Sequence, residues 1–352
     1  MSLQNGLSAL HMEMPEKIPR TEYSAHFHWN LVRKVTGIDV GSKSPQSVKE
    51  QASQKFIKEW DYGMFWNILT HNNVFDGKYT KLGHAEYMAD GEDFSAETFQ
   101  LLEDPEDVFT FDPFEVYGIR DQKVLTAEYD QNYDLMCRSY PDTANMTGIY
   151  VTCISGALEI LGWDTLLLAA GIDLRGFGEF LNRYEVWISQ YFQALAQCKA
   201  ETVMIHDDIT WTNGAFLAPA FYREFVFPAY KRQFRTLLDA GKRILYTSDG
   251  NYTEFLQDIA DCGVHGFVFE PCMDLDKICE QYGKTHVLVG NADTRILLMG
   301  DKEDIRQEVK RCINAGRNCP GYFMAVGNHI PANTPVENAL WYNEFYEKYS
   351  RR

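Results

Sequence analysis

The chain has 352 residues, enough for one large domain or two ordinary ones. Its 45% hydrophobic and 14% aromatic residues supply material for a core and exclude a disordered chain. The 50 acidic residues outnumber the 33 basic ones and give a net charge of −17, which argues against a nucleic-acid partner because phosphates need a positive surface. No apolar run reaches the length of a membrane span and the N-terminus lacks a secretory pattern, so we expect a cytoplasmic protein with no membrane partner.

Three strands are predicted in the first half of the chain. They are the β-branched or aromatic runs TEYSAHF at 21–27, FEVYG at 114–118 and TGIYVTC at 147–153. The glycine pair Gly176 and Gly178 is the nearest match to a dinucleotide fingerprint. Leu181 stands where the third glycine belongs and no strand precedes the pair, so we do not expect a dinucleotide-binding fold.

The second half alternates short buried runs with helical segments. Five of these runs predict parallel strands: 202–206, 243–247, 265–269, 286–290 and 322–326. A long amphipathic helix is predicted from Pro219 to Gly241, with a bend at Pro228. Asp301 with Asp304 opens a second helix, and TPVE at 334–337 predicts a third with a capping box and proline at its first position.

Repeated strand and helix units indicate a parallel sheet, either closed as a (β/α)₈ barrel or open and doubly wound. The strand count of eight favours the closed barrel. No composition shift or linker divides the chain, so we predict one barrel domain over 1–352 with additional N-terminal helices. The eight cysteines contain no C-x-x-C pair, and we expect them to be reduced and mostly buried, with Cys272 as the exception to watch.

Polar residues follow the five strands of the second half, where a barrel builds its chemistry. Each of them alone is more often a helix cap or a solvated turn. Several carboxylates gathered at one mouth repel one another unless they share a proton, a metal or a cationic substrate, so their convergence indicates a site. We predict that five of them surround one cleft: Asp208, Asp249, Glu270, Asn291 and His329.

Five motifs in order carry a resemblance to a known family. They are MIHDDITWTNGAFLAPAFYREFVFPAYKR at 204–232, YTSDG at 246–250, GNADTR at 290–295 and GYFMAVGNHIPANTPVEN at 321–338, with a weaker match around 19–29. The chain resembles the uroporphyrinogen decarboxylase superfamily, which also holds corrinoid-linked methyltransferases. The resemblance implies a single barrel with a deep cleft at the carboxyl ends of its strands, and it suggests a homodimer.

Two departures argue against porphyrin chemistry. The decarboxylases carry an arginine-rich N-terminal signature facing the acidic substrate, whereas this chain has Glu22 in the corresponding stretch. Their G-H-G histidine aligns with Asn328, and His329 falls one place later. We therefore expect no decarboxylation of uroporphyrinogen at a physiological rate.

The zinc-binding methyltransferases of the superfamily hold their metal through an H-x-C pair and a distant cysteine. Those positions align with Thr247, Asp249 and Asn328, so a thiolate-rich zinc site is absent. A more oxygen-rich site for zinc or another divalent ion would draw on Asp249 and Glu270, with His206 and either Cys272 or His329 as further ligands.

The resemblance favours a methyltransferase that moves a methyl group between a small substrate and a cobalamin protein or tetrahydrofolate. The catalytic residues it implies are Asp208, Asp249, Asn328 and His329. The substrate-binding residues it implies are Glu22, His206, Trp211, Asn291 and Asp293. Two alternatives stay open: a uroporphyrinogen decarboxylase, which needs no cofactor, and an inactive barrel that serves as a binding partner in a corrinoid complex.

Overall fold

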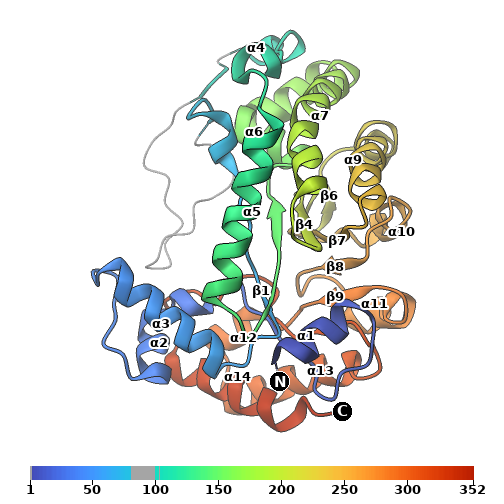
Figure 1. The fold of residues 1–352 in the computed structure, drawn as a ribbon. Helices are drawn as coiled ribbons and strands as arrows, with labels where there is room; N and C mark the ends of the chain where they lie inside the picture. The colour runs from blue at the N-terminus through green and yellow to red at the C-terminus, as the bar shows by residue number, and fades with distance from the viewer. Residues whose placement is uncertain (1, 81–99, 103) are drawn as a thin grey trace.

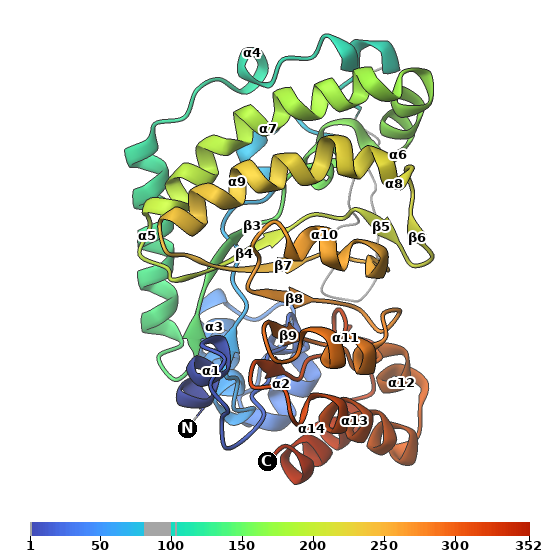
Figure 2. The same ribbon diagram turned by 90° about the vertical axis from the view of Figure 1, so that its right-hand side faces the viewer.

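A computed structural model describes residues 2–80, 100–102 and 104–352. Parallel strands occupy the centre and helices surround them (Figures 1 and 2). The strands are β1 (Met64–Phe65), β2 (Ala144–Asn145), β3 (Thr147–Ile149), β4 (Thr202–His206), β7 (Arg243–Thr247), β8 (Gly266–Val268), β9 (Val287–Val289) and β10 (Tyr322–Phe323), with a separate hairpin of β5 (Thr210–Trp211) and β6 (Gly214–Ala215).

The helices alternate with these strands along the chain. They are α1 (Ser2–Leu10), α2 (Trp29–Thr36), α3 (Gln46–Glu59), α4 (Pro113–Tyr117), α5 (Gln122–Ser139), α6 (Ile154–Ile172), α7 (Leu174–Gln197), α8 (Pro219–Phe221), α9 (Phe227–Asp239), α10 (Leu256–Ala260), α11 (Leu275–Tyr282), α12 (Thr294–Met299), α13 (Lys302–Gly316) and α14 (Val336–Tyr349). The α7 and α9 helices pack together, as do α13 and α14 (Figure 2).

The strands form a (β/α)₈ barrel whose two halves are built differently. A regular parallel ladder joins six strands in the order β10-β9-β8-β7-β4-β3, and β1 pairs with β2. The ladder does not run round the whole ring, because among the described residues β10 and β1 are joined by single bridges at Arg20 and not by a strand. This residue makes single parallel bridges to Met324 and to Tyr62, and Thr70 makes one to Ile149. The predicted fold class is confirmed, including the N-terminal helices.

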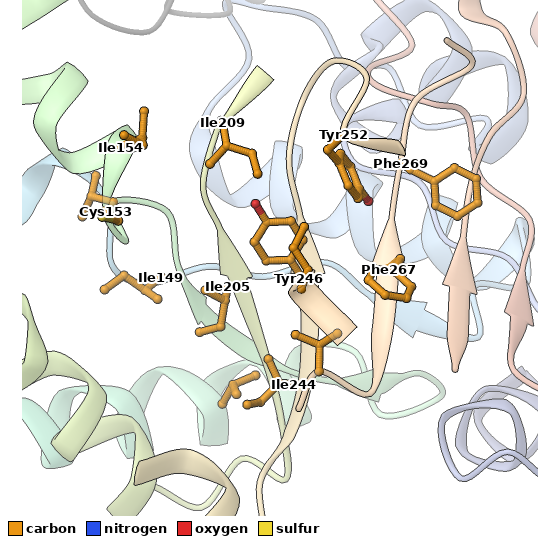
Figure 3. Close-up of a cluster of buried hydrophobic side chains, with 14 of the residues drawn as sticks. Ile149, Cys153, Ile154, Ile205, Ile209, Ile244, Tyr246, Tyr252, Phe267 and Phe269 are labelled. Carbon is orange, nitrogen blue, oxygen red and sulfur yellow. The ribbon is translucent and has the colours of Figure 1, made fainter. Parts of the chain in front are cut away.

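Alternating strand residues fill two separate cores. One side of the strands packs under the helices, where Figure 3 shows Ile205, Tyr246 and Phe267 with the start of α6. The other side fills the barrel interior with Met64, Met204, Leu245, Val268 and Phe323 among others. Leu10 and Ala9 of α1 join this interior cluster, so α1 closes the end of the barrel from which the strands begin.

The strand predictions succeed in the second half and at 147–153. The bounds of β4 and β7 are as predicted, whereas β3, β8, β9 and β10 are shorter than predicted. Two predicted strands are wrong. The 114–118 segment is α4, because Asp112 caps it, Pro113 stands in its first turn and Gly118 ends it at a φ of 74°. The 21–27 segment has no bridge of its own: the bridging residue is Arg20, directly before it, and Ala25–Phe27 forms a 3₁₀ helix, while β1 was not predicted.

The three predicted helices are present, but one predicted cap is wrong. The helix from Pro219 contains a π-helical segment, Tyr222–Val226, directly before Pro228, which agrees with the expected distortion. Asp301 and Asp304 form the predicted capping box of α13. The box predicted at 334–337 is wrong, because Pro335 is itself the N-cap of α14 and no side chain caps that helix.

The expectation about apolar runs also needs correction. Helix α6 is apolar and long enough to meet the length and composition criteria for a membrane span, but 72% of its qualifying window is buried in the structure. Its apolar character is therefore explained by packing against the barrel. All eight cysteines lie among the described residues without a disulfide, and six are buried, as predicted.

Candidate active site

A cavity of about 230 Å³ lies beyond the carboxyl ends of the strands. Its floor is the interior cluster of the barrel, against which the lining residues Tyr23, Trp66 and Tyr150 also pack. The complete lining is Tyr23, Trp66, Ile68, Tyr150, His206, Thr247, Ser248, Asp249, Val268, Phe269, Glu270, Gly327, Asn328 and His329. Residues that are far apart in sequence meet there because parallel strands bring their carboxyl ends to one face.

Three potential ligand side chains meet on one wall of this cavity. The β4–β7 register pairs His206 with Thr247, so the residues that follow these strands are neighbours. His206 Nε2 lies 3.0 Å from Asp208 Oδ1, and the Asp249 backbone N–H donates to the same carboxylate at 2.8 Å. One ligand atom each from His206, Asp208 and Asp249 fits within a 4.8 Å spread. We call these three residues the ligand cluster.

The His206 ring is held in one orientation. It stacks on Tyr150, with ring centroids 3.6 Å apart and planes at 15°, and its Nδ1 lies 3.0 Å from the Tyr150 carbonyl oxygen. Because a carbonyl only accepts, Nδ1 carries the hydrogen and Nε2 faces the Asp208 carboxylate. Two acceptors at 3.0 Å repel one another, so a proton or a metal cation belongs between Nε2 and Asp208.

Glu270 supplies a fixed negative charge on a neighbouring wall. One of its carboxylate oxygens accepts from the Gly250 N–H at 2.7 Å and the other from Asn328 Nδ2 at 3.0 Å. Both oxygens are therefore held by the protein, and the carboxylate is outside the ligand cluster.

Asp207, between His206 and Asp208, points away from the cavity. Its carboxylate accepts from the backbone N–H groups of Cys153, Ile154 and Ser155, at 3.1, 3.1 and 2.6 Å, and from the Tyr230 hydroxyl. Cys153 is the N-cap of α6 and makes no side-chain cap of its own. Asp207 thus caps α6 from another element and fixes the strand end that carries His206 and Asp208.

The family model for uroporphyrinogen decarboxylase matches residues 167–349, which is more than half of the chain. The chain belongs to the uroporphyrinogen decarboxylase family. Its curated relatives include uroporphyrinogen decarboxylases of Carboxydothermus hydrogenoformans, 27% identical over 49% of this chain and 47% of that protein, and of Syntrophotalea carbinolica, 28% identical over 43% and 42%. The chain thus spans about half the length of the curated relatives it matches.

A solved structure extends the likeness over the whole chain at the level of the fold. A methyltransferase from Methanosarcina mazei superposes on 99% of this chain and 98% of its own, with a TM-score of 0.67 and 16% identity. The barrel fold is therefore shared along the entire length, including residues before 167, where the family model does not match.

Some residues predicted for the site from the family resemblance line the cavity and others do not. His206, Asp249, Glu270, Asn328 and His329 line it, and Asp208 joins them through the ligand cluster. Trp211 lies on the β5–β6 hairpin, 49% exposed, beside Trp163 and Phe216. It is outside the lining of this cavity.

Three further predicted residues occupy structural positions behind the wall. Asn291 is buried, donates to the carbonyl oxygens of Glu270 and Met273, and accepts from Arg311. Asp293 caps α12 and pairs with Arg295 at 2.6 Å. Glu22 is buried and accepts from the Val326 N–H at 3.1 Å and the Tyr342 hydroxyl at 2.8 Å.

The aromatic part of the lining was not predicted. Tyr23 and Trp66 meet edge to face with ring centroids 4.9 Å apart, and His329 lies edge-on to Tyr23 at 6.5 Å. Tyr150 lies within the predicted 147–153 strand and directly follows the shorter β3, so the predicted strand end did not point to it. Trp66 follows the two-residue β1, for which the sequence offered no strand signal.

Proposed function

We propose that this member of the uroporphyrinogen decarboxylase family is a corrinoid-linked methyltransferase. The observation that carries the proposal is the charge of the cavity. Two carboxylates line it, a third lies beside it in the ligand cluster, and no lysine or arginine lines it among the described residues. A tetrapyrrole with many carboxylates needs guanidinium or ammonium partners, and this cavity would repel it.

The N-terminal segment supports the same choice. Arg20, next to the segment where decarboxylases are expected to present arginines, is fully buried away from the cavity. Its guanidinium donates to the Trp60 carbonyl oxygen and to Asn343, and lies 4.5 Å from the ring centroids of both Trp60 and Tyr346. It is a structural arginine that joins the first bridge of the barrel to α14, and it cannot reach a substrate.

The residues of the ligand cluster fit a divalent metal ion such as zinc. Imidazole nitrogen and carboxylate oxygen are ordinary zinc ligands, and the carbonyl that binds His206 Nδ1 directs Nε2 to the ligand position. His206, Asp208 and Asp249 would hold the ion, and a bound ion would supply Lewis acidity toward a substrate heteroatom. This set keeps the predicted ligand Asp249 and replaces the predicted Glu270 with Asp208.

Side chains of the cavity would position the methyl group that is transferred. The strand ends hold Asp249 and Glu270 on adjacent walls, and the rings of Tyr23, Trp66 and Tyr150 form an aromatic part of the lining. A donor and an acceptor bound in such a small space are held in line, which is the main requirement of a methyl transfer. The acceptor or donor on the other side would be a cobalamin protein or tetrahydrofolate.

Three measurements on the purified protein test the proposal. If the protein is a methyltransferase, elemental analysis finds bound metal. The absorption spectrum of reduced free cobalamin then also changes when a methyl donor is added. Coproporphyrinogen formed from uroporphyrinogen in proportion to the enzyme would instead make the protein a decarboxylase. Neither activity, together with retention of a corrinoid protein on the immobilised chain, would make it a binding partner.

A further inference from the structure

We propose that the central cavity binds the head of a methylated onium ion, either a quaternary ammonium or a tertiary sulfonium group, as the methyl donor. This inference rests on the proposed methyl transfer and names its substrate class. It is carried by the juxtaposition of an aromatic corner, formed by Tyr23 and Trp66, with the fixed carboxylate of Glu270 in one cavity.

The aromatic corner has the geometry that a methylated cation needs. The Tyr23 and Trp66 rings stand at 82° to each other, so they present two walls that meet at an angle. His329 adds a third ring at 77° to Tyr23. Aromatic faces attract a cation that has no N–H to donate, whereas hydrogen-bonding groups offer it little, and trimethylated heads are recognised by aromatic walls for this reason.

The charges of the cavity are consistent with a cationic ligand. Asp208, Asp249 and Glu270 bring three carboxyl groups to one strand-end face, and no lysine or arginine side chain is part of the described lining. A divalent ion held by the ligand cluster would balance two of them. Glu270 remains, held by Gly250 and Asn328 on the cavity wall, and a singly charged onium head completes the balance.

The Tyr23 hydroxyl gives an independent sign of a ligand. Its oxygen is buried and has no hydrogen-bond partner among the described residues. Burial, and then the charges of Glu22, Asp249 and Glu270, raise the pKa of Tyr23 well above its ordinary value, so the group stays a neutral donor. Since an onium head accepts no hydrogen bond, this donor is left for an oxygen atom elsewhere on the same ligand.

The chemistry balances without a proton donor at the corner. The bond between the methyl carbon and nitrogen or sulfur breaks, its electron pair stays on the heteroatom, and a neutral amine or sulfide leaves. The methyl carbon forms its new bond to a reduced corrinoid cobalt, which supplies the electron pair. A neutral ether would need acid assistance, whereas an onium does not, and a bound ion would then only hold a polar arm of the donor.

Binding tests this inference separately from catalysis. Isothermal titration on the protein as purified would compare choline with 3,3-dimethylbutan-1-ol, its neutral isostere, and tetramethylammonium with trimethylsulfonium. We expect choline to bind at least tenfold more tightly than the isostere. The two small cations report which onium is preferred, and failure of both to bind contradicts the proposal.

Variants of the lining residues test whether the onium head binds in the cavity. We expect Trp66→Leu and Glu270→Gln each to weaken choline at least tenfold, whereas Trp341→Leu on α14 leaves it unchanged. Glutamine can still accept from Gly250 and donate to a rotated Asn328, so Glu270→Gln removes the charge and keeps the fold. Equal binding of choline and its isostere, or equal loss in all three variants, would overturn the inference. Methyl transfer to free cobalamin from an uncharged donor, with no onium binding, would do so while leaving the proposed function intact.

Discussion

The two halves of the barrel contribute different chemistry to one cavity. The second half, from β4 to β10, is a continuous ladder whose strand ends deliver the charged and amide groups Asp208, Asp249, Glu270 and Asn328. The first half is joined to this ladder by single bridges, and together with β3 at the edge of the ladder it delivers the rings of Tyr23, Trp66 and Tyr150. The regular strands therefore hold the charged and amide groups in fixed positions, while the less regular half supplies an aromatic wall.

The family model covers one of these two halves and not the other. The family model spans 167–349, which contains the charged wall and none of the aromatic one. If the aromatic half decides which donor is bound, members that share the second half can differ in substrate while keeping the same strand ends. The predictions below test how far each half controls the site.

The largest loss of activity is expected at Asp249, in the second half of the barrel, which supplies the charged groups. Asp249→Asn keeps the side-chain volume and removes the charge, so we expect metal content to collapse and methyl transfer to fall at least 100-fold, with an unchanged thermal midpoint. A cap role is the competing explanation. The first N–H of the following 3₁₀ turn, that of Thr253, however, donates to the Asn251 side chain at 3.1 Å, and the N-cap residue of that turn is Tyr252.

Asn251→Ala is the matched control for this experiment. It should cost about 1 kcal/mol of stability and leave turnover and metal content unchanged. If Asp249→Asn behaves like Asn251→Ala, with full activity and bound metal, then Asp249 is structural and the charged half loses its central residue.

A large loss of stability is expected at Asp207, which ties the two halves together. Asp207→Asn sets an amide NH₂ group against the N–H donors of α6 and removes a charge-assisted cap, so we expect a loss of about 4 kcal/mol in the free energy of unfolding. Urea denaturation measures it. Because the strand end at His206 then loosens, the retained folded protein should also bind metal more weakly. Unaltered metal affinity in a destabilised variant would limit Asp207 to capping α6.

The contrast between the halves also explains what the sequence could predict. The β4–β10 strands are buried apolar runs followed by polar residues, so both the strands and their charged ends were readable. The first strand is reduced to the single residue Arg20, which bridges Tyr62 and Met324, and β1 to two residues, so no periodic pattern exists to be read. In this segment, the side chains of neighbouring residues point in different directions. Tyr23 reaches the cavity, whereas its neighbour Glu22 is directed to Tyr342 and Val326.

Glu22 gives the first half a pH dependence that can be measured. Burial raises its pKa from the ordinary value of 4.5 to about 7, although Arg20, the Val326 N–H and the Tyr342 hydroxyl oppose the shift. Between these two values the folded protein holds a proton that the unfolded chain has released, so stability falls as the pH rises through this window. Above pH 7 the cost is complete, at about 3 kcal/mol.

Glu22→Gln should remove this window. The variant gains stability over the parent above pH 7 and matches it below pH 4.5, where both side chains are neutral. The difference in urea midpoints between the two proteins, measured from pH 4 to pH 8, isolates this one group from the others that titrate. A constant difference across that range would mean that Glu22 ionises normally in the folded barrel.

The smallest effect compares two helix starts within the second half, one with a capping box and one without. The Asp304 carboxylate accepts from the Asp301 N–H at 3.0 Å, whereas Glu337 occupies the first turn of α14, where Pro335 is the N-cap and has no N–H to donate. Asp304→Ala should therefore cost about 1 kcal/mol, and Glu337→Ala less than about 0.5 kcal/mol, because only a weak interaction with the helix dipole is lost. Chemical denaturation of both variants measures the pair. Equal costs would mean that Glu337 is engaged as the 334–337 pattern predicted, and the capping box would then have to be restored to α14.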